Sequence, residues 1–312
     1  MSKQAVLLIA HGSPESVEDI PAFLQNISRG RPMSDAVVRE VQHRYAQIGI
    51  SPLTCFTVGQ ANGVANELGI PAYVGMRNWH PFIADTLRQM AADGIEQAVA
   101  ICLAPHNSRT SVGLYKQVLL EAGAPFAIDF VEEWHDHPLL IEAFAERLRA
   151  GWKSACQQHG SALPVIFTAH SVPQRTIAEG DPYEVQTRET AALVAAQLPE
   201  IGDWKFAFQS QGMSGGEWLG PTVEDTVAAL RESGHSGIFL QPIGFVCDHV
   251  EILYDIDILF RDFASRRGVE LYRAESLNDS PLFVRAVADL ARSRLAAMAQ
   301  TCRPDAQIET IL

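Results

Sequence analysis

The chain has 312 residues, of which 47% are hydrophobic and 20% are charged, and its 24 basic and 37 acidic side chains give a formal net charge of −13. This composition excludes a disordered chain and leaves room for two compact lobes of about 150 residues each. The acidic balance argues against a nucleic-acid partner, because a phosphate backbone is bound by basic side chains, and it favours a cation or a metal ion.

The chain carries no signal for a membrane or for export. No run of about 18 apolar residues is present to span a bilayer, and the N-terminal stretch MSKQAVLLIAHG has no signal-peptide cleavage site. We therefore expect a cytoplasmic protein without an integral membrane segment. The five cysteines are scattered without CxxC spacing, which favours neither a disulfide framework nor a zinc ribbon.

Short apolar runs alternate with longer segments of helical period, which predicts parallel sheets covered on both faces by helices. In chain order, we expect strands at 5–10, 71–75, 97–103, 126–131, 164–168, 205–210, 237–242 and 269–273. The helices that we expect between them span 35–47, 59–68, 80–92, 109–122, 138–158, 183–197, 223–233 and 280–300. Four strands fall in each half. The Gly, Ser and Pro residues near 157–164 mark the seam, which predicts units 1–158 and 159–279 and a C-terminal unit 280–312 whose helix packs back across the lobes.

Two stretches repeat one pattern. VLLIAHGSPES at 6–16 and VIFTAHSVPQR at 165–175 each end an apolar run in Ala-His, followed by a small residue and a proline. Ligands of parallel sheets bind beyond the carboxyl ends of the strands. We therefore expect His11, His170 and His106, which all follow predicted strands, to converge on one cleft.

The segment QPIGFVCDHVEILYDIDI at 241–258 leads from a strand into a helical pattern. Its Asp248, Glu251 and Asp255 are spaced by three and four residues, so on a helix their carboxylates share one face. A solvated acidic face near a helix N-terminus has this spacing. A path for a divalent cation has it too, and the spacing alone does not decide between them.

Three other regions hold residues that suit a ligand site. The arginines of residues 26–53 can bind carboxylates or phosphates in bidentate fashion, with surface ion pairs as the open alternative. The glycine-rich loop 209–221 lacks the GxGxxG pattern and the P-loop pattern, so we expect its Trp218 to wall a flat aromatic ligand rather than a nucleotide. The cluster EEWHDHP at 132–138 is either a metal site or the cap of a helix that begins at Pro138.

Six blocks of the chain resemble, in order, the signature blocks of ferrochelatases. They are LLIAHGSPESVEDIPAFLQNISRGRP, RYAQIGISPL, AICLAPHNSRTSVGLYK, VIFTAHSVPQRTIAEGDPY, FQSQGMSGGEWLGP and QPIGFVCDHVEILYDID. The resemblance covers nearly the whole chain and implies the α/β type II chelatase fold, in which two similar Rossmann-like lobes, each a four-stranded parallel sheet flanked by helices, enclose a porphyrin cleft. It implies insertion of Fe2+ into a porphyrin in heme biosynthesis.

The resemblance also implies roles for single residues. His170 and Glu251 match the pair regarded as metal ligands and acceptors of the pyrrole protons, and Asp255 joins them as a metal ligand. A neutral imidazole and a carboxylate suit Fe2+ and proton transfer near neutral pH. His11 stands where relatives often carry a tyrosine, and we expect it to be an axial ligand of the inserted iron. The residues expected to bind the porphyrin are His11, Ser13, Arg29, Arg31, Arg44, Tyr45, Ser51, Tyr115 and Trp218.

Departures from the family pattern refine these expectations. Leu259 stands where some relatives place a further acid, which puts a full acidic path for iron in doubt. Cys302 is the sole cysteine near the C-terminus, so we expect no 2Fe-2S cluster and no permanently bound cofactor. The expected partners are the porphyrin, ferrous iron as substrate and a downstream heme-pathway enzyme.

The motifs RGRP and NWHPF resemble the ferrochelatases of monoderm bacteria, which favours coproporphyrin III as substrate and coproheme as product. Protoporphyrin IX, which would give protoheme, is the alternative. A sirohydrochlorin or cobalt chelatase is a weaker alternative because those relatives lack the GDPY and GPTVEDT blocks. A non-catalytic tetrapyrrole carrier would not need His170 and Glu251.

Overall fold

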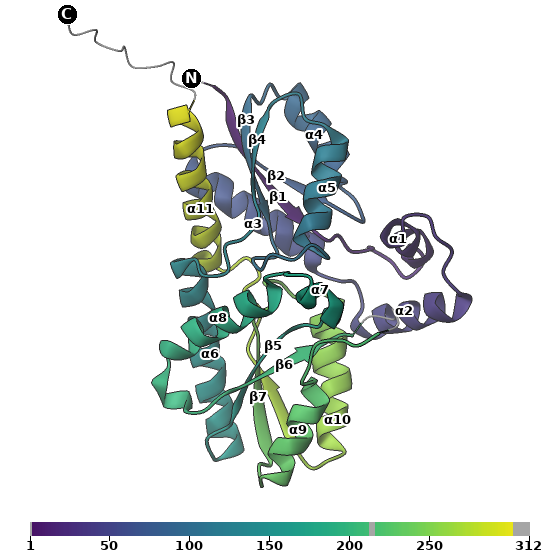
Figure 1. Ribbon diagram of the computed structural model, residues 1–312, viewed down its shortest axis with the longest axis vertical. Coiled ribbons are helices and arrows are strands. Elements are labelled where there is room, and N and C mark those ends of the chain that lie inside the picture. Colours follow the sequence, from purple (N-terminus) through teal and green to yellow (C-terminus); the bar gives the residue numbers. More distant parts are fainter. Residues whose placement is uncertain (1, 212–215, 302–312) are drawn as a thin grey trace, which may run out of the picture.

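The computed structural model describes residues 2–211 and 216–301 and contains two parallel sheets of four strands each (Figure 1). Residues 212–215 of the glycine-rich loop, and Cys302 with the rest of the predicted C-terminal unit after residue 301, lie outside the described residues. The first sheet has the order β2-β1-β3-β4 and the second the order β6-β5-β7-β8. The strands are β1 (Gln4–Ala10), β2 (Ala72–Met76), β3 (Gln97–Cys102), β4 (Ala127–Val131), β5 (Val165–His170), β6 (Lys205–Gln209), β7 (Gly237–Pro242) and β8 (Glu270–Arg273).

The strand predictions are confirmed, and each observed strand lies within two residues of its predicted bounds. The eight predicted helices are present as well: α2 (Asp35–Ile48), α3 (Leu53–Leu68), α4 (Ile83–Ala92), α5 (Val112–Ala122), α6 (Pro138–His159), α8 (Tyr183–Ala196), α9 (Val223–Glu232) and α11 (Pro281–Thr301). The elements that the pattern missed are short: α1 (Ile20–Ile27), α7 (Gln174–Ala178), the turn η1 (Pro199–Ile201) and α10 (Arg261–Ser265). Helices of one or two turns carry too little periodicity to be recognised.

The segment that follows β7 forms a π-helix, η2 (Glu251–Phe260), rather than an α-helix. Its wider turn is the kind of irregularity that is frequent at functional sites. The helix continues directly into α10. Ile252 and Ile256 of η2 are fully buried and pack in the same apolar cluster as Ile166 of β5. This packing fixes η2 against one face of the second sheet.

Alternation along the strands explains why helices cover both faces of each sheet. In β1, Leu7 packs in the cluster that includes α4 and α5, whereas Leu8 packs in the cluster that includes α3 and α11. In β5, Phe167 and Ile166 divide in the same way between two clusters. Since successive side chains alternate in direction, His170 at the end of β5 lies on the same face as Ile166, the face that η2 covers.

The last helix of the described chain packs against the first sheet, although it follows the second sheet in the sequence. α11 lies against α3 and β3 of the first sheet and also against α6 (Figure 1). Gly63 of α3 permits this close approach, because a Cβ atom at that position would lie 2.8 Å from Cγ1 of Val284. The unit limits at 158 and 279 remain predictions. Within residues 2–211 and 216–301, none of the helices combines the length and the apolar character that a membrane span requires.

Candidate active site

One cavity of about 580 Å3 lies where the carboxyl ends of the strands meet η2. Its walls include the residues that directly follow β1, β2, β3 and β5, and Gly244, two residues after β7. The three strand-end histidines, His11, His106 and His170, all line it, as the strand-end argument predicts. The volume falls within the range of sites that hold organic ligands.

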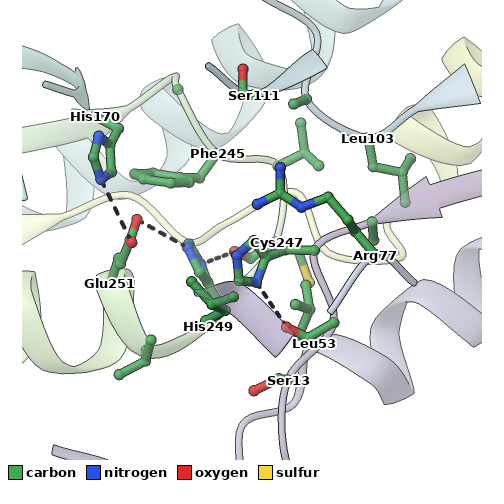
Figure 2. A pocket seen from close by; sticks show the side chains of 18 of the residues that line it. Ser13, Leu53, Arg77, Leu103, Ser111, His170, Phe245, Cys247, His249 and Glu251 are labelled. Carbon is green, nitrogen blue, oxygen red and sulfur yellow. Dashed lines mark hydrogen bonds and ion pairs between the residues drawn. The ribbon is translucent and has the colours of Figure 1, made fainter. Parts of the chain in front are cut away.

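The side chains of His170 and Glu251 lie next to each other on one wall of this cavity (Figure 2). Nδ1 of His170 donates to the carbonyl oxygen of Ser171, which can only accept. In the neutral imidazole the lone pair is therefore on Nε2, which lies 3.7 Å from Oε1 of Glu251. The end of β5 and the start of η2 thus bring together a base and a carboxylate that are far apart in the sequence.

His249 is a member of this group that the sequence analysis missed. Its Nδ1 donates to the carbonyl oxygen of Cys247 at 3.0 Å, and its Nε2 lies 3.6 Å from Oε2 of Glu251. The ring of Phe245 packs near both imidazoles, at 4.6 Å from His249 and 6.3 Å from His170 between centroids. Glu251 therefore lies between two histidines. Because His249 stands only two residues before Glu251 in the sequence, that proximity could have identified it.

The two histidines determine the ionisation of Glu251. Burial alone would raise the pKa of this carboxyl group, but the positive charge that His170 and His249 carry when protonated opposes it and brings the pKa down to about 2. The carboxylate is consequently charged at neutral pH. A fixed negative charge beside two imidazoles can stabilise a bound cation or an imidazolium that has accepted a proton.

Asp255 lies further along η2, lines the same cavity and is 5% exposed. The hydroxyl of Ser210 donates to its Oδ2, and Nη1 of Arg44 lies 3.7 Å from its Oδ1. Burial raises the pKa of Asp255 to about 6, although the hydrogen bond from Ser210 and the charge of Arg44 act in the opposite direction. Asp255 thus shares the cavity with Glu251, as predicted from their spacing.

The predicted row of three carboxylates is wrong at Asp248. Its Oδ1 accepts from Ser276 at 2.7 Å and its Oδ2 from Asn278 at 3.0 Å, and Arg273 lies 3.5 Å away. The reason is that η2 begins at Glu251, so Asp248 precedes it in a loop whose backbone is held by Asn278. Asp248 supports the loop instead of facing the cavity.

His11 lies at the end of β1 on another wall of the cavity. Its Nδ1 donates to the carbonyl oxygen of Gly12 at 2.9 Å, and its ring meets the ring of Phe23 edge-on at 5.8 Å. Burial, assisted by the charge of Arg77, lowers the pKa of His11 to about 4. The imidazole is therefore neutral at pH 7, with its Nε2 lone pair available as a ligand.

Arg77 is the second residue that the sequence analysis missed. It follows β2, lines the cavity and places its guanidinium 4.8 Å from the ring centroid of Tyr115 (Figure 2). Among the described residues, its buried Nη1 finds no hydrogen-bond partner. An anionic group of a ligand would satisfy this nitrogen. Ligands of parallel sheets bind beyond the carboxyl ends of the strands, so the position of Arg77 just after the predicted strand 71–75 could have identified it.

The structure brings most of the predicted porphyrin-binding residues to the cavity, although their roles remain predictions. Those that line it are His11, Ser13, Arg44, Tyr45, Tyr115 and Trp218. Three others do not line it: Arg29 donates to Gln117 at 3.1 Å, Arg31 donates to the carbonyl oxygen of Ser28 at 3.2 Å, and Ser51 is buried beside Leu53. Ser13 and Tyr45 are joined by a hydrogen bond of 3.1 Å.

The alternative metal site at 132–138 is not supported. His135 pairs with Glu189 at 3.0 Å and His137 with Asp289 at 3.4 Å, and Pro138 begins α6. In the part of the chain that the structure describes, no three His, Cys, Asp or Glu side chains are arranged to hold a metal ion. The segment is the cap of a helix.

Comparison with known proteins agrees with this geometry. Residues 3–295 match the family model described as ferrochelatase. The ferrochelatase of Acidobacterium capsulatum is 53% identical over 308 residues, which cover 94% of this chain and 95% of that protein. The coproporphyrin III ferrochelatase of Geobacillus sp. is 35% identical over 306 residues, which cover 94% of this chain and 98% of that protein.

Among solved structures, SirB from Bacillus subtilis with Fe3+ aligns with a TM-score of 0.61 at 11% identity, covering 96% of this chain and 98% of that one. At this identity the likeness supports the two-lobed chelatase fold alone. The family match is stronger evidence, because it extends from residue 3 to residue 295 and includes all the residues that line the cavity. On that evidence the chain belongs to the ferrochelatase family.

Proposed function

We propose that this ferrochelatase takes coproporphyrin III as its porphyrin and releases coproheme. The observation that carries the proposal is the presence of two guanidinium groups, those of Arg44 and Arg77, on the walls of the cavity of an acidic protein. Guanidinium groups bind carboxylates bidentately, and these two come from different elements, α2 and the end of β2. Coproporphyrin III has a propionate on each of its four pyrrole rings, whereas protoporphyrin IX has propionates on two adjacent rings, so coproporphyrin III is better suited to contact both arginines. Relatives with the name coproporphyrin III ferrochelatase, at 33% identity in Oceanobacillus iheyensis and 36% in Anoxybacillus flavithermus, support the choice.

His170 and Glu251 carry the chemistry in this proposal. Insertion of Fe2+ requires two pyrrole N–H protons to leave as the metal–nitrogen bonds form. His170 and His249 each present an Nε2 lone pair beside Glu251, so each can hold one proton before it passes to solvent. The Glu251 carboxylate stabilises the imidazolium that results, and it attracts the incoming Fe2+ together with Asp255.

The cavity walls orient the ring. Tyr115 and Trp218 offer flat surfaces to a macrocycle, and the arginines hold its carboxylates. Contacts with the periphery of the ring can be used to distort its centre, so that the nitrogen lone pairs turn toward the metal. A downstream enzyme of the heme pathway is the partner that we expect to receive the product.

A comparison of two substrates tests the proposed specificity. The protein is supplied with Fe2+ under anaerobic conditions, and loss of the free-base absorption is followed with coproporphyrin III or protoporphyrin IX. We expect kcat/KM to be at least about tenfold higher for coproporphyrin III, because propionates on different sides of the ring let it contact both arginines at once. A preference for protoporphyrin IX would overturn the choice of substrate, and turnover of neither porphyrin would overturn the assigned activity.

His11 is proposed as the axial ligand of the iron in the product complex. The absorption spectrum of coproheme bound to the protein should change when His11 is replaced by Ala, because loss of an imidazole ligand alters the spin state. His43→Ala is the matched control, since His43 is exposed on α2. Identical spectra for the wild type and His11→Ala would remove this role.

A further inference from the structure

The carboxylate of Asp255 has both of its oxygens engaged in the ligand-free cavity. Oδ2 accepts from the hydroxyl of Ser210, and Oδ1 faces Nη1 of Arg44 at 3.7 Å. The two partners come from different parts of the fold, because Ser210 directly follows β6 and Arg44 is on α2. In this state each oxygen of the Asp255 carboxylate already has a partner, and Arg44 is the partner of Oδ1.

The contact from Ser210 is built into the backbone. Ser210 has a φ of 59°, in the left-handed region that residues other than glycine rarely adopt. Such conformations persist where the surroundings hold them, and they cluster at functional sites. The hydroxyl of Ser210 is thereby aimed at Oδ2, which leaves Oδ1 as the oxygen that can change partner.

The contact from Arg44 is of a different kind. At 3.7 Å it is an ion pair without a hydrogen bond, because N–H to O bonds measure about 2.7–3.2 Å. The same guanidinium bonds to Glu40 through Nε at 2.9 Å and lies 5.2 Å from the ring centroid of Tyr254. Its side chain is 37% exposed against 7% for that of Asp255, so an incoming carboxylate meets Arg44 first.

We propose that Arg44 is a positioning residue that exchanges Asp255 for a propionate of the porphyrin, and that this exchange frees Oδ1 of Asp255 for the metal. The inference rests on the proposed function, which supplies the propionate and the metal. A propionate on a flexible arm can reach the short bidentate geometry that the buried Asp255 does not have. Substrate and metal binding are then coupled, so each increases the affinity for the other by the same factor.

Binding of Mn2+, measured by electron paramagnetic resonance on the whole protein, tests the exchange without turnover. In the wild type, saturation with coproporphyrin III should raise the affinity for Mn2+ roughly tenfold, within the usual range of coupling between two sites. In Arg44→Gln, the porphyrin-free protein should already bind Mn2+ more tightly, and added porphyrin should change little. In Asp255→Asn the porphyrin should have no effect either. Saturation of each variant is verified by absorbance titration.

Arg39→Gln is the matched control, because it removes the same charge from an exposed position of the same helix. It should behave as the wild type does. If porphyrin raises Mn2+ affinity equally in Arg44→Gln, the effect comes from the charge of the propionates alone and the exchange is wrong. An unchanged Mn2+ affinity in the wild type also overturns it. Turnover of Fe2+ and coproporphyrin III by the same preparation separates failure of the exchange from failure of the proposed function.

Discussion

Replacing Gly244 by alanine tests whether the position of His170 limits the reaction. Gly244 follows β7 and lines the cavity, and the backbone at Ala169 lies directly against it. A Cβ atom at residue 244 would lie 2.8 Å from Cα of Ala169 and 3.3 Å from N of His170. Ordinary carbon contacts are about 3.5–4.0 Å, so the two segments would have to separate by roughly half an ångström or more.

The size of the effect follows from this displacement. Overpacking of a buried site costs about 1–3 kcal/mol of unfolding free energy. A misplacement of about 1 Å in a catalytic group can cost about a hundredfold in rate, so we expect kcat to fall by about tenfold. The KM for the porphyrin should change less than kcat, because Arg44 and Arg77, which hold its carboxylates, come from α2 and the end of β2 and not from β5.

Steady-state Fe2+ insertion and thermal unfolding measure the two effects separately. Gly113→Ala is the matched control, because a Cβ there would lie 3.6 Å from its nearest neighbour and position 113 is inside α5. Because position 113 is the second residue of α5, an alanine there should leave both kcat and the unfolding midpoint close to those of the wild type. A Gly244→Ala protein with wild-type kcat and an unchanged unfolding midpoint would refute the reasoning.

Three further predictions follow. His170→Ala should lose about 10²- to 10⁴-fold in Fe2+ insertion while the absorbance titration with porphyrin stays near that of the wild type; a smaller loss would remove its role as base. Arg77→Leu should raise the KM for coproporphyrin III about tenfold with little change in kcat or unfolding midpoint, because its buried Nη1 has no partner to lose in the described residues. Burial lowers the pKa of His106 from 6.5 to about 3. Between these two pH values the imidazole is protonated in the unfolded chain and neutral in the folded protein, so the free energy of unfolding decreases as the pH falls below 6.5. Denaturant unfolding should show that the difference between wild type and His106→Gln shifts by about 1.4 kcal/mol between pH 7.5 and pH 5.5, and a constant difference would contradict the cause.

The parallel sheets could be predicted because the strands are short apolar runs, and the central strands β1, β3, β5 and β7 are buried on both faces. The same strands predicted that His11, His106 and His170 meet, since the carboxyl ends of parallel strands lie at one edge. The pairing of His170 with Glu251 did not follow from spacing. It depended on the family resemblance, because the two residues belong to different elements of the second lobe.

Helix propensity and hydrophobic periodicity could not predict several other features of the site. Asp248 fits a helical row with Glu251 as a pattern, but the helix starts later because Asn278 and Ser276 hold the preceding loop from a distant segment. The π-helical geometry of η2 likewise has no pattern in the sequence that distinguishes it from an α-helix. Arg77 could have been predicted, because it closely follows the predicted strand 71–75. The roles of Arg29, Arg31 and Ser51 at the porphyrin remain predictions.

The placement of α11 has a consequence for how the chain is made. Val284 and Val287 of α11 share an apolar cluster with Val6 and Leu8 of β1. A ribosome produces β1 and α3 before α11, so the part of this apolar face that α11 covers stays exposed until α11 has been made. The first sheet therefore completes its apolar packing only after the second sheet has been made, and the nascent chain presents a hydrophobic surface to chaperones until α11 has emerged.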